Sequence, residues 1–329
     1  MPNVSIIINT WNRRASLLAT IGSVLDQEGA PPDEVIVVDD GSTDGTPEAL
    51  EDLVRQGKIR ILATRRLGSA GTRNRGFDLA RGELLTTMDN DVICMRDWLR
   101  TVVDVFEKDP SIGIVGAWGL RGAWLPHAEL LRGMGSYTGR ALEDIHAVSG
   151  HAMTFRREVL RRIGRLDDQM FLYWEDTDFC WRAVLAGFRV VSLNEVLTFH
   201  MKERSAVSRP LARQLAYEAM KNKILTHLKC APAGMAARFL AYELLRSVKR
   251  TLLCPTIAPS IWRAWLWNLR HLGGTAWSRR EIYSQGSGRA RRLLDLIRKD
   301  QEDDRRFVRY EQEVERRIAC AAAATEAMG

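Results

Sequence analysis

Apolar runs and amphipathic stretches take turns along the first part of the chain. Residues 4–8 and 35–38 are continuous apolar runs, which is typical of strands buried on both faces. Residues 13–25 lie between them and repeat apolar side chains at spacings of three and four, as an amphipathic helix does. The pattern then predicts a helix at 47–56, a strand at 59–62, a helix at 70–80 and a strand at 83–88. This order predicts an α/β fold with a mostly parallel, Rossmann-like sheet and flanking helices.

The chain changes character after about residue 205. Before that point the pattern predicts helices at 96–108, 156–163 and 176–186 and strands at 112–117, 189–192 and 196–199. It also predicts a glycine-rich irregular stretch up to about 147. We expect this stretch to be a loop on the side of the site where a second substrate, the acceptor, binds. Beyond 205 the strand pattern ends, and helices are separated by breaks at Pro232, Pro255, Pro259 and 286–288. We therefore expect two domains, residues 1–205 with the sheet and residues 206–329 as a helical C-terminal region.

Polar side chains gather where the predicted parallel strands end. Asn9 and Thr10 follow the first strand, the loop 39–44 follows the second, and the acidic triplet 89–91 follows the strand at 83–88. Ligands of such sheets bind outside the carboxyl ends of the strands. We therefore expect one binding site along this edge.

The triplet offers two carboxylates, Asp89 and Asp91, at the end of an apolar strand. Mg²⁺ and Mn²⁺ bind through one or two carboxylates together with phosphate oxygens, and such an ion neutralises a diphosphate leaving group. The alternative is a turn or helix cap in which these side chains and Asn90 make only local hydrogen bonds.

Two further acidic segments have a similar pair of interpretations. In the loop 39–44 a carboxylate accepts hydrogen bonds from a base or ribose, or it forms a turn and a helix cap. Trp174, Glu175 and Asp176 lie at a predicted helix start, where the helix dipole favours ionised acids. A carboxylate there either acts as general base for an acceptor hydroxyl or only caps the helix. His200 follows an apolar strand, and a lone histidine is more often structural than a ligand.

Several types of site are absent from the sequence. It contains neither G-x-x-x-x-G-K-[ST] nor G-x-G-x-x-G, which excludes a P-loop and a dinucleotide fingerprint. The five cysteines form no CxxC pair, so we expect neither a zinc ribbon nor a disulfide framework, and we expect a reducing compartment. The first apolar run is too short for a signal peptide, and no apolar stretch has membrane-spanning length. We expect a cytoplasmic protein, with any membrane contact at the inner face of the cell membrane.

Charge is distributed unevenly between the two parts. Residues 206–329 carry 23 Lys and Arg against 12 Asp and Glu, whereas residues 1–205 carry 25 against 29, and the whole chain has a net charge of +7. Basic surfaces meet phosphates, or they are simply solvated helix faces. The amphipathic segments 236–253 and 262–270 are expected to rest on a membrane surface or, alternatively, to pack within the chain or form a homodimer. Residues 289–324 are expected to be helical and to self-associate, and no nucleic-acid partner is expected.

Four segments occur in a characteristic order: VSIIINTWNR at 4–13, EVIVVDDGSTDGT at 34–46, GSAGTRNRGFDLARGELLTTMDND at 68–91, and FRREVLRRIGRLDDQMFLYWEDTDFCWRAVLAGFRVV at 155–191. With them the chain resembles family 2 glycosyltransferases of the GT-A fold, especially bacterial rhamnosyltransferase-like members. The resemblance covers about residues 3–204. It implies a GT-A domain that binds a nucleotide-diphosphate sugar.

The resemblance also implies roles for individual residues. Asp176 matches the catalytic base, and the metal site for Mg²⁺ or Mn²⁺ matches Asp89, Asp91 and His200. The residues implied in substrate binding are Asn9, Thr10, Asn12, Arg13, Asp40, Ser42, Arg73, Asp89, Asn90, His151, Trp174 and Glu175. Trp11 replaces the usual Tyr or Phe, and His151 stands where a small residue is usual, so we expect His151 to reshape the acceptor pocket.

The implied reaction is a one-step inverting transfer. A dTDP- or UDP-sugar, carrying rhamnose or another hexose, gives its sugar to an acceptor hydroxyl of a glycan or a lipid-linked saccharide. The alternative is a nucleotide-sugar-binding scaffold protein at the membrane that has no turnover. The intact acids at 89, 91 and 176 favour the enzyme. A sugar nucleotidyltransferase needs a glycine-rich loop directly after the first strand, and residues 9–13 are not such a loop.

Overall fold

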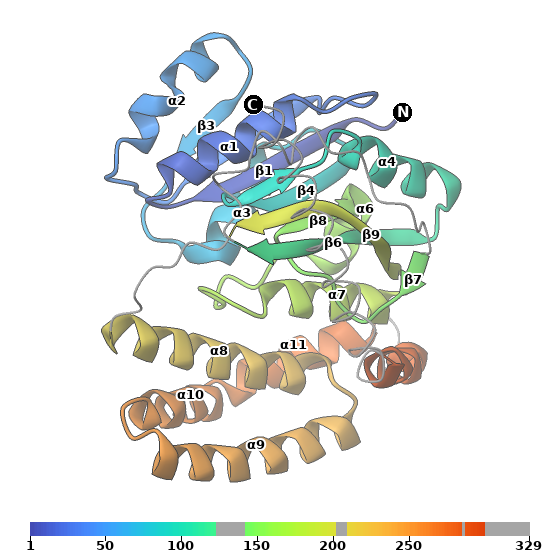
Figure 1. The fold of residues 1–329 in the computed structure, drawn as a ribbon. Coiled ribbons are helices and arrows are strands. Elements are labelled where there is room, and N and C mark those ends of the chain that lie inside the picture. The colour runs from blue at the N-terminus through green and yellow to red at the C-terminus, as the bar shows by residue number, and fades with distance from the viewer. Residues whose placement is uncertain (123–141, 202–208, 285–286, 300–329) are drawn as a thin grey trace, which may run out of the picture.

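The computed structural model describes residues 1–122, 142–201, 209–284 and 287–299. Within them a single β-sheet carries helices on both faces, and four long helices follow it along the chain (Figure 1). The predicted α/β sheet with a helical C-terminal region is thereby confirmed.

The first half of the sheet is parallel. β1 (Val4–Thr10) lies between β2 (Glu34–Asp39) and β4 (Leu84–Asp89), and β3 (Arg60–Ala63) pairs with β2. Most side chains of β1, β2 and β4 are buried, which explains their continuous apolar runs.

The second half of the sheet mixes directions. β8 (Ala152–Arg156) is antiparallel to β4 and to β6 (Ile112–Gly122), and β6 runs parallel to β9 (Arg189–Met201). β5 (Val92–Cys94) and β7 (Leu142–Asp144) are antiparallel to β9. It follows that β1, β2, β3, β4, β6 and β9 point the same way, so their carboxyl ends lie along one edge of the sheet.

One face of the sheet is covered by α1 (Arg14–Leu25), α2 (Thr46–Arg55) and α4 (Trp98–Lys108), whose buried apolar side chains form one cluster with Ile6 and Ile8 of β1. Successive side chains of a strand point to opposite faces. The intervening Ile7 therefore belongs to the other face.

That other face carries α3 (Gly68–Leu79), α6 (Arg157–Ile163) and α7 (Glu175–Ala186). α3 lies so close to the sheet that a Cβ added to Gly76 would clash with the Ile7 side chain. This close packing fixes the start of α3 beside the carboxyl ends of β1 and β4.

The C-terminal region consists of α8 (Arg209–Cys230), α9 (Ala233–Leu253), α10 (Ala258–Arg270) and α11 (Leu272–Ser284), and residues 290–299 are also helical. α8 and α11 lie against α7, whereas α9 lies furthest from the sheet (Figure 1). A separate apolar cluster formed by α8, α9 and α10 holds these helices together. The last strand thus ends before residue 206, where the second domain was predicted to begin.

Most predicted elements match within two residues, but some predictions were wrong. The strands predicted at 189–192 and 196–199 are the single strand β9, and β6 continues through the start of the stretch predicted to be irregular. β5, β7 and β8 were also missed, and β5 and β7 have only three residues each. The predicted acceptor-side loop between 123 and 141, and the predicted C-terminal helix beyond 299, lie outside the described residues.

Candidate active site

A cavity of about 530 Å³ opens at the carboxyl end of β4 and the start of α7. The predicted site residues that line it are Arg73, Asp89, His151, Trp174, Glu175, Asp176 and His200. These residues come from five elements or the turns beside them, so the sheet edge brings together side chains that are far apart in the sequence.

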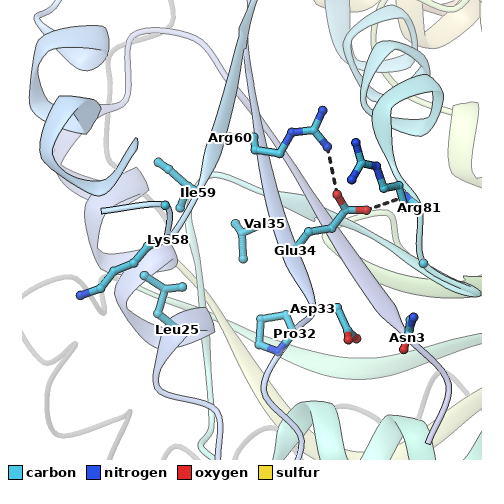
Figure 2. A pocket seen from close by; sticks show the side chains of 12 residues that line it. Asn3, Leu25, Pro32, Asp33, Glu34, Val35, Lys58, Ile59, Arg60 and Arg81 are labelled. Atoms are coloured by element: carbon cyan, nitrogen blue, oxygen red, sulfur yellow. Dashed lines mark hydrogen bonds and ion pairs between the residues drawn. The ribbon is translucent and has the colours of Figure 1, made fainter. Parts of the chain in front are cut away.

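Another cavity, of about 570 Å³, lies at the opposite, amino ends of β2 and β3 (Figure 2). There Glu34 accepts hydrogen bonds from Ser5 Oγ and from the Arg81 amide, and it lies 3.1 Å from Arg60 Nη1. Burial raises the pKa of Glu34, but these hydrogen bonds outweigh burial and hold the pKa below its usual value. The Glu34 carboxylate is thus engaged in joining neighbouring strands.

The three predicted metal ligands lie together at the end of β4. Asp89 ends β4 and Asp91 follows in the turn to β5, whose pairing with β9 places Val92 opposite His200. The Asp91 carbonyl accepts a hydrogen bond from the Met201 amide at 2.7 Å. The register of β5 against β9 therefore brings His200 to the two carboxylates.

The geometry of this cluster fits a divalent cation. His200 Nε2 lies 3.0 Å from Asp91 Oδ1 and 3.9 Å from Asp89 Oδ2, and one ligand atom of each residue lies within 4.8 Å of the others. All three residues are partly exposed, which leaves space for phosphate oxygens and water. Carboxylates suit Mg²⁺ and Mn²⁺, and the imidazole nitrogen favours the transition metal.

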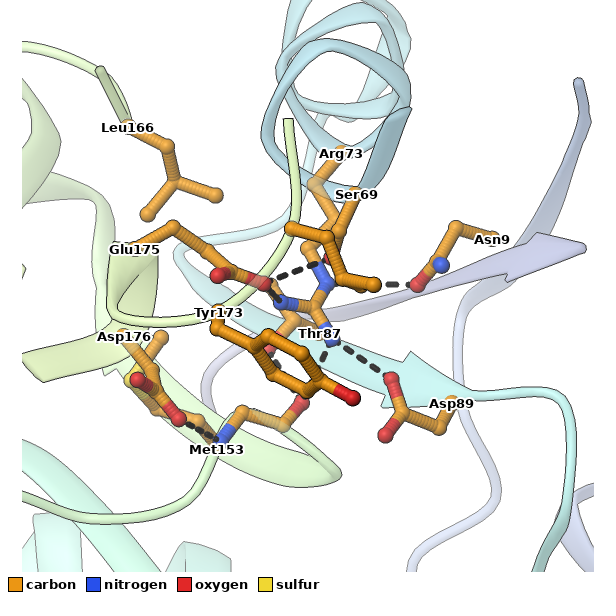
Figure 3. A network of polar contacts seen from close by, with 12 residues as sticks. Asn9, Ser69, Arg73, Thr87, Asp89, Met153, Leu166, Tyr173, Glu175 and Asp176 are labelled. Atoms are coloured by element: carbon orange, nitrogen blue, oxygen red, sulfur yellow. Dashed lines mark hydrogen bonds and ion pairs between the residues drawn. The ribbon is translucent and has the colours of Figure 1, made fainter. Parts of the chain in front are cut away.

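Arg73 connects this cluster to the start of α7 (Figure 3). Its guanidinium donates to Asp89 Oδ1 at 2.6 Å and to Glu175 Oε1 at 2.9 Å. It also donates to Asn9 Oδ1 and to the Gly150 carbonyl, each at 3.2 Å. The side chain is 3% exposed, so Arg73 acts as an internal counter-ion. Its predicted contact with the donor stays a prediction.

The charges of this network shift one another. Burial raises the pKa of Asp89, but Arg73, His200 and His151 outweigh it and hold the pKa below its usual value. Burial also raises the pKa of Glu175, and there Arg73 does not overcome the burial and the nearby negative charge of Asp176. Asp89 is therefore ionised at neutral pH, whereas Glu175 takes up a proton more readily than an ordinary glutamate.

Glu175 and Asp176 begin α7 and have different surroundings (Figure 3). Glu175 is 5% exposed and accepts a hydrogen bond from Ser69 Oγ at 2.6 Å, in addition to the one from Arg73. Asp176 is half-buried, and its two oxygens accept hydrogen bonds from the Gly150 amide at 2.9 Å and from its neighbour's amide at 2.7 Å. Asp176 therefore presents an oriented carboxylate to the cavity, and a substrate contact of Glu175 stays a prediction.

The two residues before α7 have an unusual backbone. Tyr173 and Trp174 have φ values of 70° and 72°, in the left-handed region that residues other than glycine rarely adopt. Asn222 of α8 donates hydrogen bonds to the carbonyls of Leu172 and Tyr173, both at 2.9 Å. Helix α8 thus supports one wall of the cavity, on which Tyr173 is 44% exposed.

His151 lies behind the metal cluster. The pairing of β8 with β4 continues to the His151 carbonyl, which accepts a hydrogen bond from the Asp89 amide at 3.0 Å. The His151 ring is 6% exposed, stacks on His200 with 5.4 Å between ring centroids, and has Nε2 3.1 Å from Thr198 Oγ1. Its contact with the acceptor stays a prediction, because the structure places its ring against His200, the predicted metal ligand.

The predicted nucleotide-binding residues join the loops that follow β1, β2 and β4. The side-chain carbonyl of Asn12 accepts a hydrogen bond from the backbone amide of Thr43 at 2.7 Å, and the backbone amide of Asn12 donates to Ser42 Oγ at 2.9 Å. Asn90 Nδ2 donates to Thr10 Oγ1 at 2.8 Å. These bonds hold the three loops in one arrangement beside the metal cluster.

Asp40 accepts hydrogen bonds that fix the turn leading into α3. Its Oδ1 accepts hydrogen bonds from the Leu67 amide at 2.7 Å and from Thr64 Oγ1 at 2.9 Å, and its Oδ2 accepts one from the Gly68 amide at 2.9 Å. A carboxylate has about four acceptor positions, so one remains for a ribose or base. The contact of Asp40 with substrate stays a prediction.

Four residues of the site were not predicted from the sequence: Ser69, Gly150, Tyr173 and Thr198. They act through a hydroxyl, a backbone amide or an aromatic ring, and their positions follow from tertiary contacts. A search for acidic residues at strand ends does not detect such residues. Arg13, by contrast, was predicted and lies half-buried next to the start of α1.

The chain is similar to known proteins in both sequence and fold. Residues 5–164 match the family model described as Glycosyl transferase family 2. An uncharacterized glycosyltransferase of Nostoc sp. is 27% identical over 250 residues, which cover 68% of this chain and 74% of that protein. A polyprenol monophosphomannose synthase of Mycolicibacterium smegmatis is 29% identical over 218 residues, which cover 60% of this chain and 77% of that protein.

A similar fold is found in a solved structure. The mannosyltransferase of Pyrobaculum calidifontis in complex with GDP-Man and Mn²⁺ superposes with a TM-score of 0.53 at 21% identity, covering 92% of this chain and 88% of that one. From the family match, the relatives and this shared fold it follows that residues 5–164 belong to a family 2 glycosyltransferase domain and that the chain has the GT-A fold.

Proposed function

We propose that the chain transfers a sugar from a nucleotide-diphosphate donor to an acceptor hydroxyl, with inversion at the anomeric carbon. The observation that carries this proposal is that Asp176 lines the same cavity as Asp89 and His200. A general base and a cation site for a diphosphate are the two parts that this reaction needs. The family match supports the same class of reaction.

Asp89, Asp91 and His200 are proposed to hold the divalent cation. When bound, the cation neutralises negative charge on the departing diphosphate. The imidazole ligand favours Mn²⁺ over Mg²⁺. The presence of Mn²⁺ in the mannosyltransferase complex supports this choice.

Asp176 is proposed as the general base. Its carboxylate accepts the proton of the acceptor hydroxyl while the hydroxyl oxygen attacks the anomeric carbon from the face opposite the diphosphate. The new bond to the acceptor oxygen forms as the bond to the diphosphate oxygen breaks, and the electron pair of that bond leaves with the nucleoside diphosphate. The amides of Gly150 and Thr177 already hold the carboxylate in place, which reduces the reorganisation needed for reaction.

The resemblance seen in the sequence is the basis for proposing a donor and an acceptor. We propose a dTDP- or UDP-sugar held by the loops at Asn9, Asn12 and Asp40, and an acceptor in a glycan or a lipid-linked saccharide. The exposed ring of Tyr173 offers the acceptor sugar a flat apolar surface in the cavity. The similarity to a polyprenol monophosphomannose synthase supports a lipid-linked acceptor.

Asp176→Asn tests the base directly. We expect the variant to bind UDP and Mn²⁺ with wild-type affinity in calorimetry, while the release of nucleoside diphosphate slows by a factor of about 10² to 10⁴. Glu158→Gln is the matched control, because Glu158 also lies in the first turn of a helix but outside the cavity. Undiminished transfer by Asp176→Asn would remove this residue as the base.

The donor is best identified by a screen of UDP-, dTDP- and GDP-sugars for Mn²⁺-dependent thermal stabilisation and turnover. GDP-mannose is included because the similar mannosyltransferase binds it. The enzyme would be contradicted by a wild-type protein that binds a donor yet transfers its sugar neither to water nor to any acceptor, and so releases no nucleoside diphosphate. That result would support the scaffold alternative.

A further inference from the structure

Helix α9 buries polar side chains and exposes apolar ones. Glu243 and Ser247 are 1% and 0% exposed, whereas Leu245 and Leu252 are 72% and 79% exposed. A surface helix of a globular protein normally has the opposite arrangement. The large apolar side chains on its outer face are Tyr242, Leu244, Leu245, Val248, Leu252 and Leu253, which are between 44% and 79% exposed.

Specific contacts fix this rotation of α9. Glu243 Oε2 lies 3.1 Å from Lys223 Nζ of α8. Ser247 Oγ accepts a hydrogen bond from the indole N–H of Trp265 of α10 at 3.0 Å. The side that carries Glu243 and Ser247, together with Phe239 and Leu240, is thus the packing side, and Leu245 and Leu252 face away from α8 and α10.

The apolar face continues onto α10. Trp262 Nε1 donates to Thr251 Oγ1 at 3.0 Å, which joins the start of α10 to the end of α9. Trp262 and Leu266 are 39% and 44% exposed. We use the term α9 surface for the following exposed apolar residues: Tyr242, Leu245, Val248, Leu252, Leu253, Trp262 and Leu266. Both helices lie on the side of the molecule away from the sheet (Figure 1).

The charge around the α9 surface has one sign. Residues 233–280 contain eight Lys and Arg and a single acid, the buried Glu243. Arg238, Lys249 and Arg263 are exposed among the apolar side chains. A twofold contact between two copies would place the same cations on both sides of the interface. An anionic lipid surface instead complements the cations and accepts the leucine and tryptophan side chains.

We propose that the α9 surface docks on one leaflet of an anionic lipid bilayer. Its apolar side chains enter the interfacial region, and the basic side chains contact lipid phosphates. Among the described helices, none has the length and apolar character needed to span a bilayer. The end of α9 lies on the same side of the molecule as the start of α7, where Asp176 is placed (Figure 1). Docking therefore holds the cavity near the lipid surface.

Vesicle flotation with the full chain tests the proposal. We expect binding to vesicles of phosphatidylcholine and phosphatidylglycerol at low salt, and weaker binding to phosphatidylcholine alone. Leu245→Ser with Leu252→Ser should lower the partition coefficient about tenfold for each leucine. Leu18→Ser is the matched control, since Leu18 is 39% exposed on α1 of the catalytic domain, and it should bind as the wild type does.

The basic side chains are tested separately. Arg238→Ala with Lys249→Ala should weaken binding to the anionic vesicles about fivefold for each lost charge, with no effect on phosphatidylcholine vesicles. Unchanged thermal unfolding and unchanged binding of UDP with Mn²⁺ show that the variants are folded. Because flotation does not depend on turnover, its result is separate from the test of the proposed transferase reaction.

Three outcomes would overturn the proposal. The first is a wild type that does not float with anionic vesicles at low salt. The second is leucine variants that bind vesicles as the wild type does. The third is a concentration-dependent dimer, or a complex with RNA, that forms with the wild type and is abolished in the leucine variants, while neither the wild type nor any variant binds lipid.

Discussion

Asn222 Nδ2 lies 2.9 Å from the carbonyl oxygen of Tyr173, and it makes a second hydrogen bond to the Leu172 carbonyl. Asn222 is fully buried on α8, and Tyr173 has the left-handed backbone of the turn that leads into α7. A residue other than glycine stays in this conformation only where its surroundings hold it. The C-terminal region therefore helps to place Asp176, although none of its described residues contributes an acid to the cavity.

Replacing Asn222 should separate positioning from binding. Asn222→Leu keeps the branched shape of the side chain but removes both donors, so we expect turnover to fall between about tenfold and a hundredfold. The affinity for UDP with Mn²⁺, measured by calorimetry, should change little, because the metal cluster lies on other elements. The free energy of unfolding should also fall by about 1–3 kcal/mol.

Asn268→Leu is the matched control for this variant. Asn268 is buried and also donates to two carbonyls, those of Lys221 and Ala264, but these lie within the C-terminal helices. We expect it to lose stability and to keep the wild-type turnover number. Equal losses of turnover in both variants would show that Asn222 acts only through stability.

His151 is predicted to support the metal ligand His200. Partners that orient a metal-bound imidazole typically contribute a factor of about 10–100 to metal affinity. We expect His151→Ala to weaken Mn²⁺ binding by that factor in calorimetry with UDP present, and His200→Ala to weaken it further. His146→Ala is the control, because His146 contacts Trp181 and not the cluster. Wild-type Mn²⁺ affinity in His151→Ala would leave its ring with a packing role only.

The acids of the site could be predicted because each has a local signal. Asp89 and Asp91 follow an apolar strand, and Asp176 lies at the start of an amphipathic helix. His200 was placed only through the family resemblance, because the pairing that brings it to Asp91 involves β5, a strand of three residues. Such a short strand has no periodicity to detect.

The outer face of α9 shows another limit of sequence patterns. Spacing alone indicated one apolar face through Phe239, Leu240, Leu244 and Val248. In the structure Phe239 and Leu240 pack inward against the C-terminal cluster, whereas Leu244 and Val248 are 44% and 49% exposed. Apolar residues occur around most of this helix, so its period does not decide which side is buried. The ion pair of the buried Glu243 with Lys223 decides it, and this pair forms between two helices.

Arg73 should be important for stability as well as for the site. Arg73→Met leaves the carboxylates of Asp89 and Glu175 without their shared cation, and breaking a buried pair on one side costs about 3–5 kcal/mol. Urea unfolding of the metal-free protein measures this loss. Arg165→Met removes the exposed pair with Asp78 and should cost less than about 1 kcal/mol. Similar small losses in both variants would contradict the role of Arg73 as an internal counter-ion.

His227 gives the fold a specific dependence on pH. Its ring is 6% exposed and contacts the rings of Trp174, Trp181 and Phe239. Burial lowers the pKa of His227 from 6.5 to about 4. Because the folded pKa lies below the unfolded one, the unfolded chain binds this proton first as the pH falls. The stability contribution is complete above pH 6.5, and about 3 kcal/mol is lost by the time the pH reaches the folded pKa.

His227→Phe should remove this part of the pH dependence. Phenylalanine keeps an aromatic ring beside Phe239 but cannot be protonated, so its free energy of unfolding should fall less than that of the wild type between pH 6.5 and 4. Urea unfolding at a series of pH values measures the difference. His271→Phe, which replaces an exposed histidine at the end of α10, should retain the full wild-type slope. If His227→Phe retained that slope too, the acid sensitivity would belong to other groups.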